Sequence, residues 1–116
     1  MNLVSLALLW ILAQPGKELF ERRCSGCHSL DKNKEGPLLR AVYGRAAGTA
    51  PGFEYSEALK AARFTWDANT LDKWLADPEQ LVPGNDMAFR LVTAEERAAI
   101  IDYLRRVTES ATEPRP

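Results

Sequence analysis

Both cysteines and the only histidine of this 116-residue chain lie within five consecutive residues, Cys24-Ser25-Gly26-Cys27-His28. Three such side chains are too few for a zinc site built from four cysteine and histidine ligands. Two cysteines are also fewer than the four or more that a disulfide-stapled domain of this size usually contains. The chain therefore has one short cluster for its special chemistry, and the rest of the fold has to be arranged around it.

The spacing of the cluster is Cys-x-x-Cys-His, the pattern of covalent haem attachment. Two thiols three positions apart on one helical turn can reach both vinyl groups of one porphyrin, and the next residue can direct its imidazole at the iron. A thioredoxin-like redox pair would require a βαβ pattern, which the sequence does not show. A strained disulfide, half of a zinc site or a chance pairing would also be compatible with the spacing. The cluster favours one covalent haem c on Cys24 and Cys27, with His28 as an axial ligand.

The second axial ligand cannot be a histidine of this chain, because no second histidine exists. The two methionines are Met1, in an apolar N-terminal segment, and Met87, in the turn-rich segment 83–89. A lone methionine usually fills a gap in a core, but Met87 is the one candidate thioether beyond the N-terminal segment. A Met/His pair raises the reduction potential and leaves the iron no open position. We therefore expect Met87 to be the second iron ligand.

Hydrophobic periodicity and capping residues predict an all-α fold with about four to five helices and no strands. The clearest helices are expected over 16–23, over 56–63 behind a Ser56 cap, from an Asp67 cap to Pro78, and from the capping box Thr93–Glu96 to Thr108. Residues 31–52 hold four glycines and two prolines and are expected to form a loop. Loops this long in so small a domain need something to pack on, and a haem would provide it.

Composition places the chain among single-domain globular proteins. Its formal net charge of −1 argues against a nucleic-acid-binding protein, and its 46% of hydrophobic residues argue against disorder. Residues 3–13 carry no charge but are too few to cross a bilayer, which takes about 20 apolar residues. We interpret residues 1–13 as a signal peptide cleaved after Ala13, or otherwise as an N-terminal anchor. Residues 14–109 are then the haem domain, and residues 110–116 a flexible tail.

Beyond the cluster, the order of motifs resembles the class I c-type cytochromes, of the mitochondrial cytochrome c and bacterial cytochrome c2 kind. The resemblance covers residues 16–107 and implies the small cytochrome c fold, with its helices and long loops wrapped around one covalently bound haem. The motifs that carry it, besides the cluster, are Gly16-Lys17-Glu18-Leu19-Phe20, Gly36-Pro37-Leu38, Tyr43-Gly44-Arg45, the segment 48–55, Trp66, the segment 71–78 and the segment 83–89.

The resemblance also implies roles for individual residues. Cys24 and Cys27 would carry the haem, His28 and Met87 would bind its iron, and the carbonyl of Pro37 would accept a hydrogen bond from His28. The residues expected near the haem propionates are Arg45, Tyr55, Trp66 and Asn85. Those expected around the two iron ligands, besides Pro37, are Trp74, Phe89 and Leu59. Those expected where the first and last helices cross are Gly16, Phe20, Ile100 and Tyr103.

Three departures from the family pattern stand out. Trp74 lies where the family usually has a tyrosine whose hydroxyl approaches the methionine sulfur, and Leu59 replaces a common asparagine of an internal water network. Mitochondrial relatives ring the haem edge with lysines, but here most of those places are acidic or neutral. They are Glu18, Glu79, Gln80 and Asp86. The resemblance therefore predicts a drier haem crevice and weaker steering toward acidic partners.

The function that the resemblance implies is one-electron transfer, without enzymatic activity. The partners would be transient redox proteins, a bc1-type reductase and a terminal oxidase or reaction centre. The protein would be a periplasmic monomer that binds neither nucleic acid nor a small-molecule substrate. Two further possibilities are a dedicated haem subunit of a dehydrogenase or oxidase, which would expose a large apolar patch, and a carrier tethered by residues 1–13. A peroxidase-like enzyme is disfavoured because Met87 would fill the open iron position.

Overall fold

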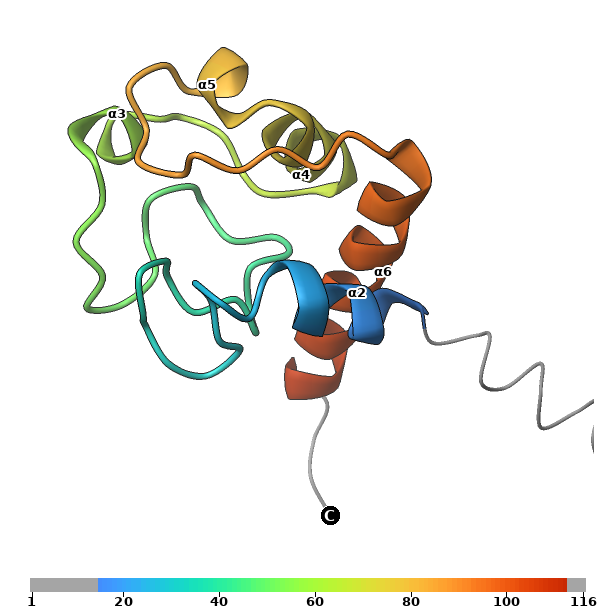
Figure 1. Cartoon of the computed structure of the whole chain (residues 1–116). Coiled ribbons are helices and arrows are strands. Elements are labelled where there is room, and N and C mark those ends of the chain that lie inside the picture. Colours follow the sequence, from blue (N-terminus) through green and yellow to red (C-terminus); the bar gives the residue numbers. More distant parts are fainter. Residues whose placement is uncertain (1–14, 113–116) are drawn as a thin grey trace, which may run out of the picture.

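The computed structural model describes residues 15–112 of the chain. The helices of this part are α2 (Pro15–Arg23), α3 (Glu57–Lys60), α4 (Ala68–Ala76), α5 (Pro78–Leu81) and α6 (Ala94–Thr112). These residues contain no β-strand, and their one β-type pairing is an isolated bridge between Ala46 and Thr65. Figure 1 shows α2 crossing α6, with α4 and α5 at the other end of the molecule and long loops between them. The predicted all-α fold is confirmed.

Local sequence explains where the helices begin. Pro15 is the first residue of α2, a position at which its missing N–H leaves no hydrogen bond unmade. In front of α4, the Asp67 carboxylate accepts a hydrogen bond from the Thr70 N–H at 2.8 Å, and the Thr70 hydroxyl oxygen accepts one from the Asp67 N–H at 2.9 Å. These reciprocal bonds form a capping box, and such caps typically contribute about 1 kcal/mol.

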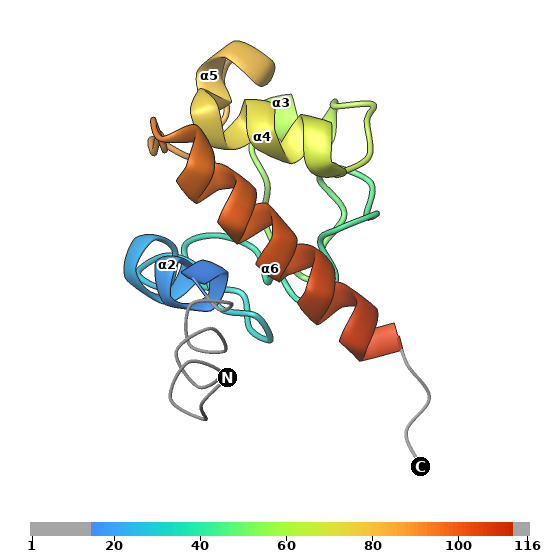
Figure 2. The ribbon, with the colours of Figure 1, turned by 90° about the vertical axis from the view of Figure 1, so that its right-hand side faces the viewer.

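The first and last described helices cross in close contact (Figure 2). A Cβ atom at Gly16 of α2 would press on the carbonyl oxygen of Ala99 and come within 2.9 Å of the Tyr103 Cβ. One turn further on, the rings of Phe20 and Tyr103 have their centres 5.4 Å apart. Phe20 also belongs to the buried cluster that contains Ile100, the most buried large side chain of the described residues. The structure thus brings together the four residues expected at this crossing.

Gly16→Ala should lower the free energy of unfolding by about 1–3 kcal/mol, the usual range for overpacking. The added methyl group meets backbone, so it can be accommodated only if α2 moves away from α6. Gly26→Ala is the matched control, because a Cβ at position 26 would have no heavy atom within 4 Å. Thermal and denaturant unfolding of the two variants give the comparison, and equal stabilities would show that the crossing is not tight.

Two expectations about the boundaries of the helices in the middle of the chain are wrong. Pro78 does not end a helix: α4 already ends at Ala76, and Pro78 is the first residue of α5. The Asp77 carboxylate caps this new helix by accepting a hydrogen bond from the Gln80 N–H at 3.3 Å, and proline is well suited to the first position of a helix. The helix expected over 56–63 is limited to Glu57–Lys60, although its cap is Ser56 as expected.

The last helix is longer than predicted. It continues past Thr108 to Thr112, so residues 110–112 of the expected tail are helical. An ion pair of 2.9 Å between Arg105 and Glu109, one turn apart, supports this extension. Residues 113–116 of the expected tail lie outside the described residues.

The loop that follows α2 is fastened to other parts of the chain. Arg40 donates to both carboxylate oxygens of Asp31, at 2.6 and 2.9 Å, and its carbonyl oxygen accepts a hydrogen bond from the Thr108 hydroxyl of α6 at 2.7 Å. The Asn33 side chain donates to the carbonyl of Pro51 at 2.9 Å. These hydrogen bonds fix the path of the loop between α2 and α3, which has no regular secondary structure.

The N-terminal interpretation stays a prediction. Residues 1–13, expected to be a signal peptide or an anchor, lie outside the described residues. Within the described residues, no helix has the length and apolar character needed to cross a membrane.

Candidate haem site

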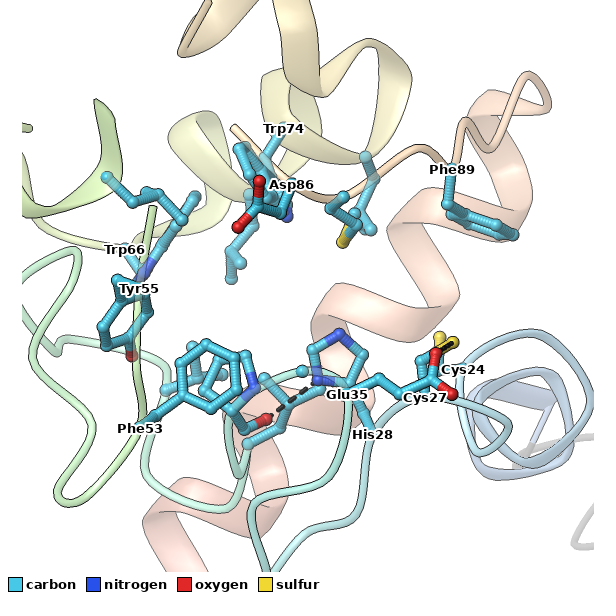
Figure 3. Close-up of a pocket in the computed structure, with 18 of the residues that line it drawn as sticks. Cys24, Cys27, His28, Glu35, Phe53, Tyr55, Trp66, Trp74, Asp86 and Phe89 are labelled. Carbon is cyan, nitrogen blue, oxygen red and sulfur yellow. Dashed lines mark hydrogen bonds between the residues drawn. The ribbon is translucent and has the colours of Figure 1, made fainter. Parts of the chain in front are cut away.

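A cavity of about 460 Å³ lies in the middle of the described fold. Its walls come from α2, α4, α6, the loop between α2 and α3, and the residues 86–89. They are mostly apolar, with Leu71 and Leu75 of α4 and Leu104 of α6 among them. Figure 3 shows His28 on one side of the interior, and Asp86 and Trp74 on the opposite side. The volume is within the range of about 300–1,000 Å³ that is typical of cofactor and ligand sites.

The turn that follows α2 places the cysteine–histidine cluster at the edge of this cavity. The Cys24 N–H donates to the carbonyl of Phe20 at 2.8 Å, and the His28 N–H donates to the carbonyl of Cys24 at 2.9 Å. The backbone therefore keeps a nearly helical course beyond Arg23. Cys24, Cys27 and His28 all line the cavity, and Figure 3 shows the two cysteines side by side while the imidazole points inward. Two thioether bonds and one axial ligand require this arrangement.

The acidity of the thiols argues against a redox-active or nucleophilic cysteine pair. Burial raises the pKa of Cys24 to about 11, and the neighbouring Cys27 adds to the shift. The pKa of Cys27 is raised as well, mainly because its thiol donates a hydrogen bond to the Glu35 carboxylate at 3.5 Å. Reactive cysteines of the thioredoxin type have lowered pKa values. The structure therefore disfavours the main alternative to haem attachment.

His28 is held in one orientation by the two residues Gly36 and Pro37. Its Nδ1–H donates to the carbonyl oxygen of Pro37 over 2.8 Å, which leaves Nε2 with a free lone pair. A Cβ atom at Gly36 would come within 2.7 Å of both ring nitrogens, so a larger residue would displace the imidazole. Burial lowers the pKa of His28, although the bond to Pro37 acts in the opposite direction. A neutral, oriented imidazole is suited to bind a metal ion.

Met87 lines the cavity from the connection between α5 and α6. Its neighbour Asn85 turns the chain: Oδ1 accepts a hydrogen bond from the Met87 N–H at 2.7 Å, and Nδ2 donates to the carbonyl of Val82 at 2.9 Å. Asn85 is not among the residues that line the cavity. The structure therefore gives Asn85 a role in orienting the Met87 backbone, and its expected contact with the propionates stays a prediction.

Arg45 gives an observation that points to a bound anion. Its Nε and Nη1 atoms are buried and have no hydrogen-bond partner among the described residues, and burial lowers the pKa of the guanidinium. Tyr55 lines the same cavity, and its phenolic oxygen accepts from the Ala50 N–H at 2.9 Å, which leaves the O–H free to donate. Buried guanidinium nitrogens that lack acceptors are unfavourable. The carboxylates of a haem would supply acceptors, so the residues present fit this group.

The remaining predicted residues also lie in the cavity wall. Trp66 and Trp74 are buried and meet edge to face with ring centres 5.4 Å apart, which fixes the two indoles against each other. Leu59 and Phe89 line the cavity as well, and Figure 3 shows Phe89 at the edge of the site, on the same side as the two cysteines. Leu59, which is apolar, and Trp74, which carries no hydroxyl, both line the cavity. Both departures from the family pattern are therefore part of its wall.

Several residues of the wall have no role that the sequence indicates. Phe53 packs edge to face on Tyr55 with ring centres 4.8 Å apart, and Glu35 bonds to Cys27. Both lie in a loop without periodicity, so nothing in the local pattern indicates which side chains face inward. For the contact of Gly36 with the imidazole, the one available signal is a Gly-Pro pair shortly after the histidine.

Known proteins resemble this chain over most of its length. Cytochrome c of Euglena viridis is 44% identical over 100 residues, which cover 84% of this chain and 98% of that protein. Cytochrome c2 iso-2 of Magnetospirillum molischianum is 46% identical over 85 residues, 71% of this chain and 88% of that protein. The solved structure of cytochrome cH from Methylobacterium extorquens matches with a TM-score of 0.77 at 41% identity, over 81% of this chain and 97% of that chain. The sequence model of the family, described as cytochrome c, matches residues 13–108, and the chain thus belongs to the cytochrome c family, whose members carry one covalently bound haem c.

Proposed function

We propose that this member of a family of electron carriers carries single electrons through one haem attached at Cys24 and Cys27, with His28 and Met87 as axial ligands. The observation that supports the proposal is that one cavity is lined by all four of these side chains and also by Arg45, whose Nε and Nη1 atoms are buried without a hydrogen-bond partner. When bound, a haem supplies an iron that alternates between the ferrous and ferric states.

The residues of the chain have distinct tasks in this proposal. Pro37 fixes the imidazole of His28 through the Nδ1 hydrogen bond, so Nε2 faces the iron. Met87 would be the second ligand of the iron, so no open position would be left for a substrate, and the mostly apolar walls would limit the access of water. Arg45 neutralises a propionate charge inside the protein. A site that is complete before and after electron transfer needs little rearrangement, which suits a carrier better than an enzyme.

The purified protein should show covalent haem and both axial ligands. A haem stain on a denaturing gel tests the attachment at Cys24 and Cys27. The optical spectrum of the oxidised protein tests the ligands, since a weak absorption band near the red edge marks methionine–iron ligation. A stained protein without that band would contradict the role of Met87, and an unstained protein would contradict covalent attachment.

The compartment and the partners are part of the proposal. An uncharged N-terminal segment of signal-peptide length, together with relatives named cytochrome c2 and cytochrome cH, supports a periplasmic carrier between a bc1-type reductase and a terminal oxidase or reaction centre. Among the described residues, Val92 is the only large hydrophobic side chain that is strongly exposed. These residues therefore show no large apolar patch of the kind that a dedicated haem subunit would expose to its partner. N-terminal sequencing of the native protein decides between cleavage after Ala13 and a tether.

The charges around the cavity predict a weak dependence on salt. Glu35 and Asp86 are exposed residues of the cavity lining. Oxidation by a mitochondrial-type oxidase should therefore slow less with rising ionic strength than it does for a lysine-ringed cytochrome c. Asp86→Lys should steepen the dependence more than Glu95→Lys, since Glu95 is exposed but does not line the cavity. Rate constants measured across ionic strength give the answer, and a steep fall for the wild type would contradict the prediction.

A further inference from the structure

The part of the chain that carries Met87 has no regular secondary structure of its own. Residues 82–93, which we call the Met87 segment, connect α5 to α6. In the first half of the segment, Asn85 closes one turn, and the Gly84 N–H donates to the Glu79 carboxylate of the short helix α5. These bonds are local, so they do not fix Met87 relative to the far wall of the cavity. Its place depends on how the second half is held.

Arg97 provides side-chain hydrogen bonds that hold the second half, beside an ion pair of 3.2 Å between Arg90 of the segment and Asp77. From the first turn of α6, its Nη1 donates to the carbonyl oxygens of Leu91 and Val92, both at 2.8 Å. Its Nε donates to the Asp72 carboxylate of α4 at 2.7 Å. The Leu91 N–H donates to the carbonyl of Leu75, also in α4, at 2.7 Å. One side chain therefore ties α4, α6 and the Met87 segment together.

The place of Arg97 within its helix has no explanation in the helix itself. A cation in the first turn lies at the positive end of the helix dipole, which is unfavourable. The side chain is also only 13% exposed, and burying a guanidinium is unfavourable unless its donors are satisfied. Two of its three hydrogen bonds go to the Met87 segment, so the segment is what this side chain serves to fix.

Arg97 and its hydrogen bonds to Leu91 and Val92, which we call the clamp, lie close to the expected iron ligand Met87. Leu91 is four residues after Met87, a stretch that spans at most about 14 Å when fully extended, and Phe89 between them lines the cavity. We propose that Arg97 is a positioning residue that holds the Met87 segment against α4 and thereby keeps the Met87 sulfur on the haem iron. This inference rests on the proposed function, in which Met87 is an axial ligand.

An imidazole titration of the oxidised holoprotein tests the inference, because imidazole can bind the iron only by displacing Met87. Arg97→Met keeps a long apolar stem but cannot form the three hydrogen bonds. It should tighten the apparent Kd for imidazole by about tenfold, the effect of losing hydrogen bonds worth about 1.4 kcal/mol in total. It should also weaken the red-edge band and lower the reduction potential, because a thioether is a soft ligand that favours the ferrous state.

Arg105→Met is the matched control. Arg105 lies on the same helix and forms ion pairs with Asp102 and Glu109, and none of these three residues lines the haem cavity. This variant should keep the wild-type Kd for imidazole, the red-edge band and the potential. Both variants also lose an ion-paired arginine, so a difference between them reports on the Met87 segment.

Two outcomes would overturn the inference. If Arg97 were merely structural, Arg97→Met would lower the Tm but leave the imidazole Kd and the band as in Arg105→Met. If Arg97→Met does not fold, Arg97→Lys and Asp72→Asn take its place, each with an intermediate tightening expected, and a wild-type Kd in both would equally reject the clamp. A wild-type protein without the red-edge band would reject the Met87 assignment of the proposed function, a result distinct from a normal band that Arg97 does not influence.

Discussion

The chain without haem is expected to be largely unfolded at 25 °C. The apolar walls of the cavity of about 460 Å³ would then lose the contacts that a bound haem makes with them, and each large apolar side chain that is no longer buried costs about 1.5–3 kcal/mol. The whole stability of a domain is only about 5–15 kcal/mol. Far-UV circular dichroism and amide hydrogen exchange of a Cys24→Ala/Cys27→Ala variant, purified free of haem, measure the loss against the holoprotein.

A control separates the haem from the loss of the thiols. The double variant reconstituted with non-covalent haem should regain helix content, since the walls would again be filled. A haem-free chain that unfolds cooperatively near the Tm of the holoprotein would show that the cavity walls can collapse on one another, and it would contradict this prediction.

Met87→Ala is expected to lower the reduction potential by a few hundred millivolts, within the roughly 0.8 V span that axial ligands can produce. The thioether stabilises ferrous iron, and its loss leaves a harder ligand or an open position. The red-edge band should disappear, and imidazole should bind far more tightly than to the wild type. Redox titration and ligand binding on the same sample measure both effects.

Met87→His separates the two consequences of losing the sulfur. A second imidazole should close the open position again, so external imidazole would bind weakly, while the potential would stay low because nitrogen replaces sulfur. A Met87→Ala protein with the wild-type potential and no new ligand affinity would mean that another side chain, not Met87, completes the iron coordination.

Much of the site can be predicted from the sequence because it is local. The cysteine–histidine cluster needs only the single turn that follows α2, and the cap at Asp67 needs only Thr70 three residues later. Pro78 is ambiguous in the sequence because proline both ends and begins helices, and the Asp77 cap decides which of the two occurs.

The contacts between distant segments cannot be predicted in this way. In the sequence, Arg97 looks like an ordinary surface charge. Its partner on α4, Asp72, lies 25 residues earlier in the chain. The spacing of residues along the chain does not indicate such pairs. Only a resemblance to a known family could do so.

The crossing of α2 and α6 has a consequence for the order of events during synthesis. Gly16 and Tyr103 are in contact although nearly the whole domain separates them along the chain, and contacts of this separation form late and slowly. A ribosome therefore releases Cys24 and Cys27 long before α6, which crosses the helix in front of them, exists. During that interval both thiols are open to attachment chemistry, including Cys24, which is partly buried in the folded protein. The crossing of α2 and α6 then completes the fold beside Cys24, after the haem has been attached.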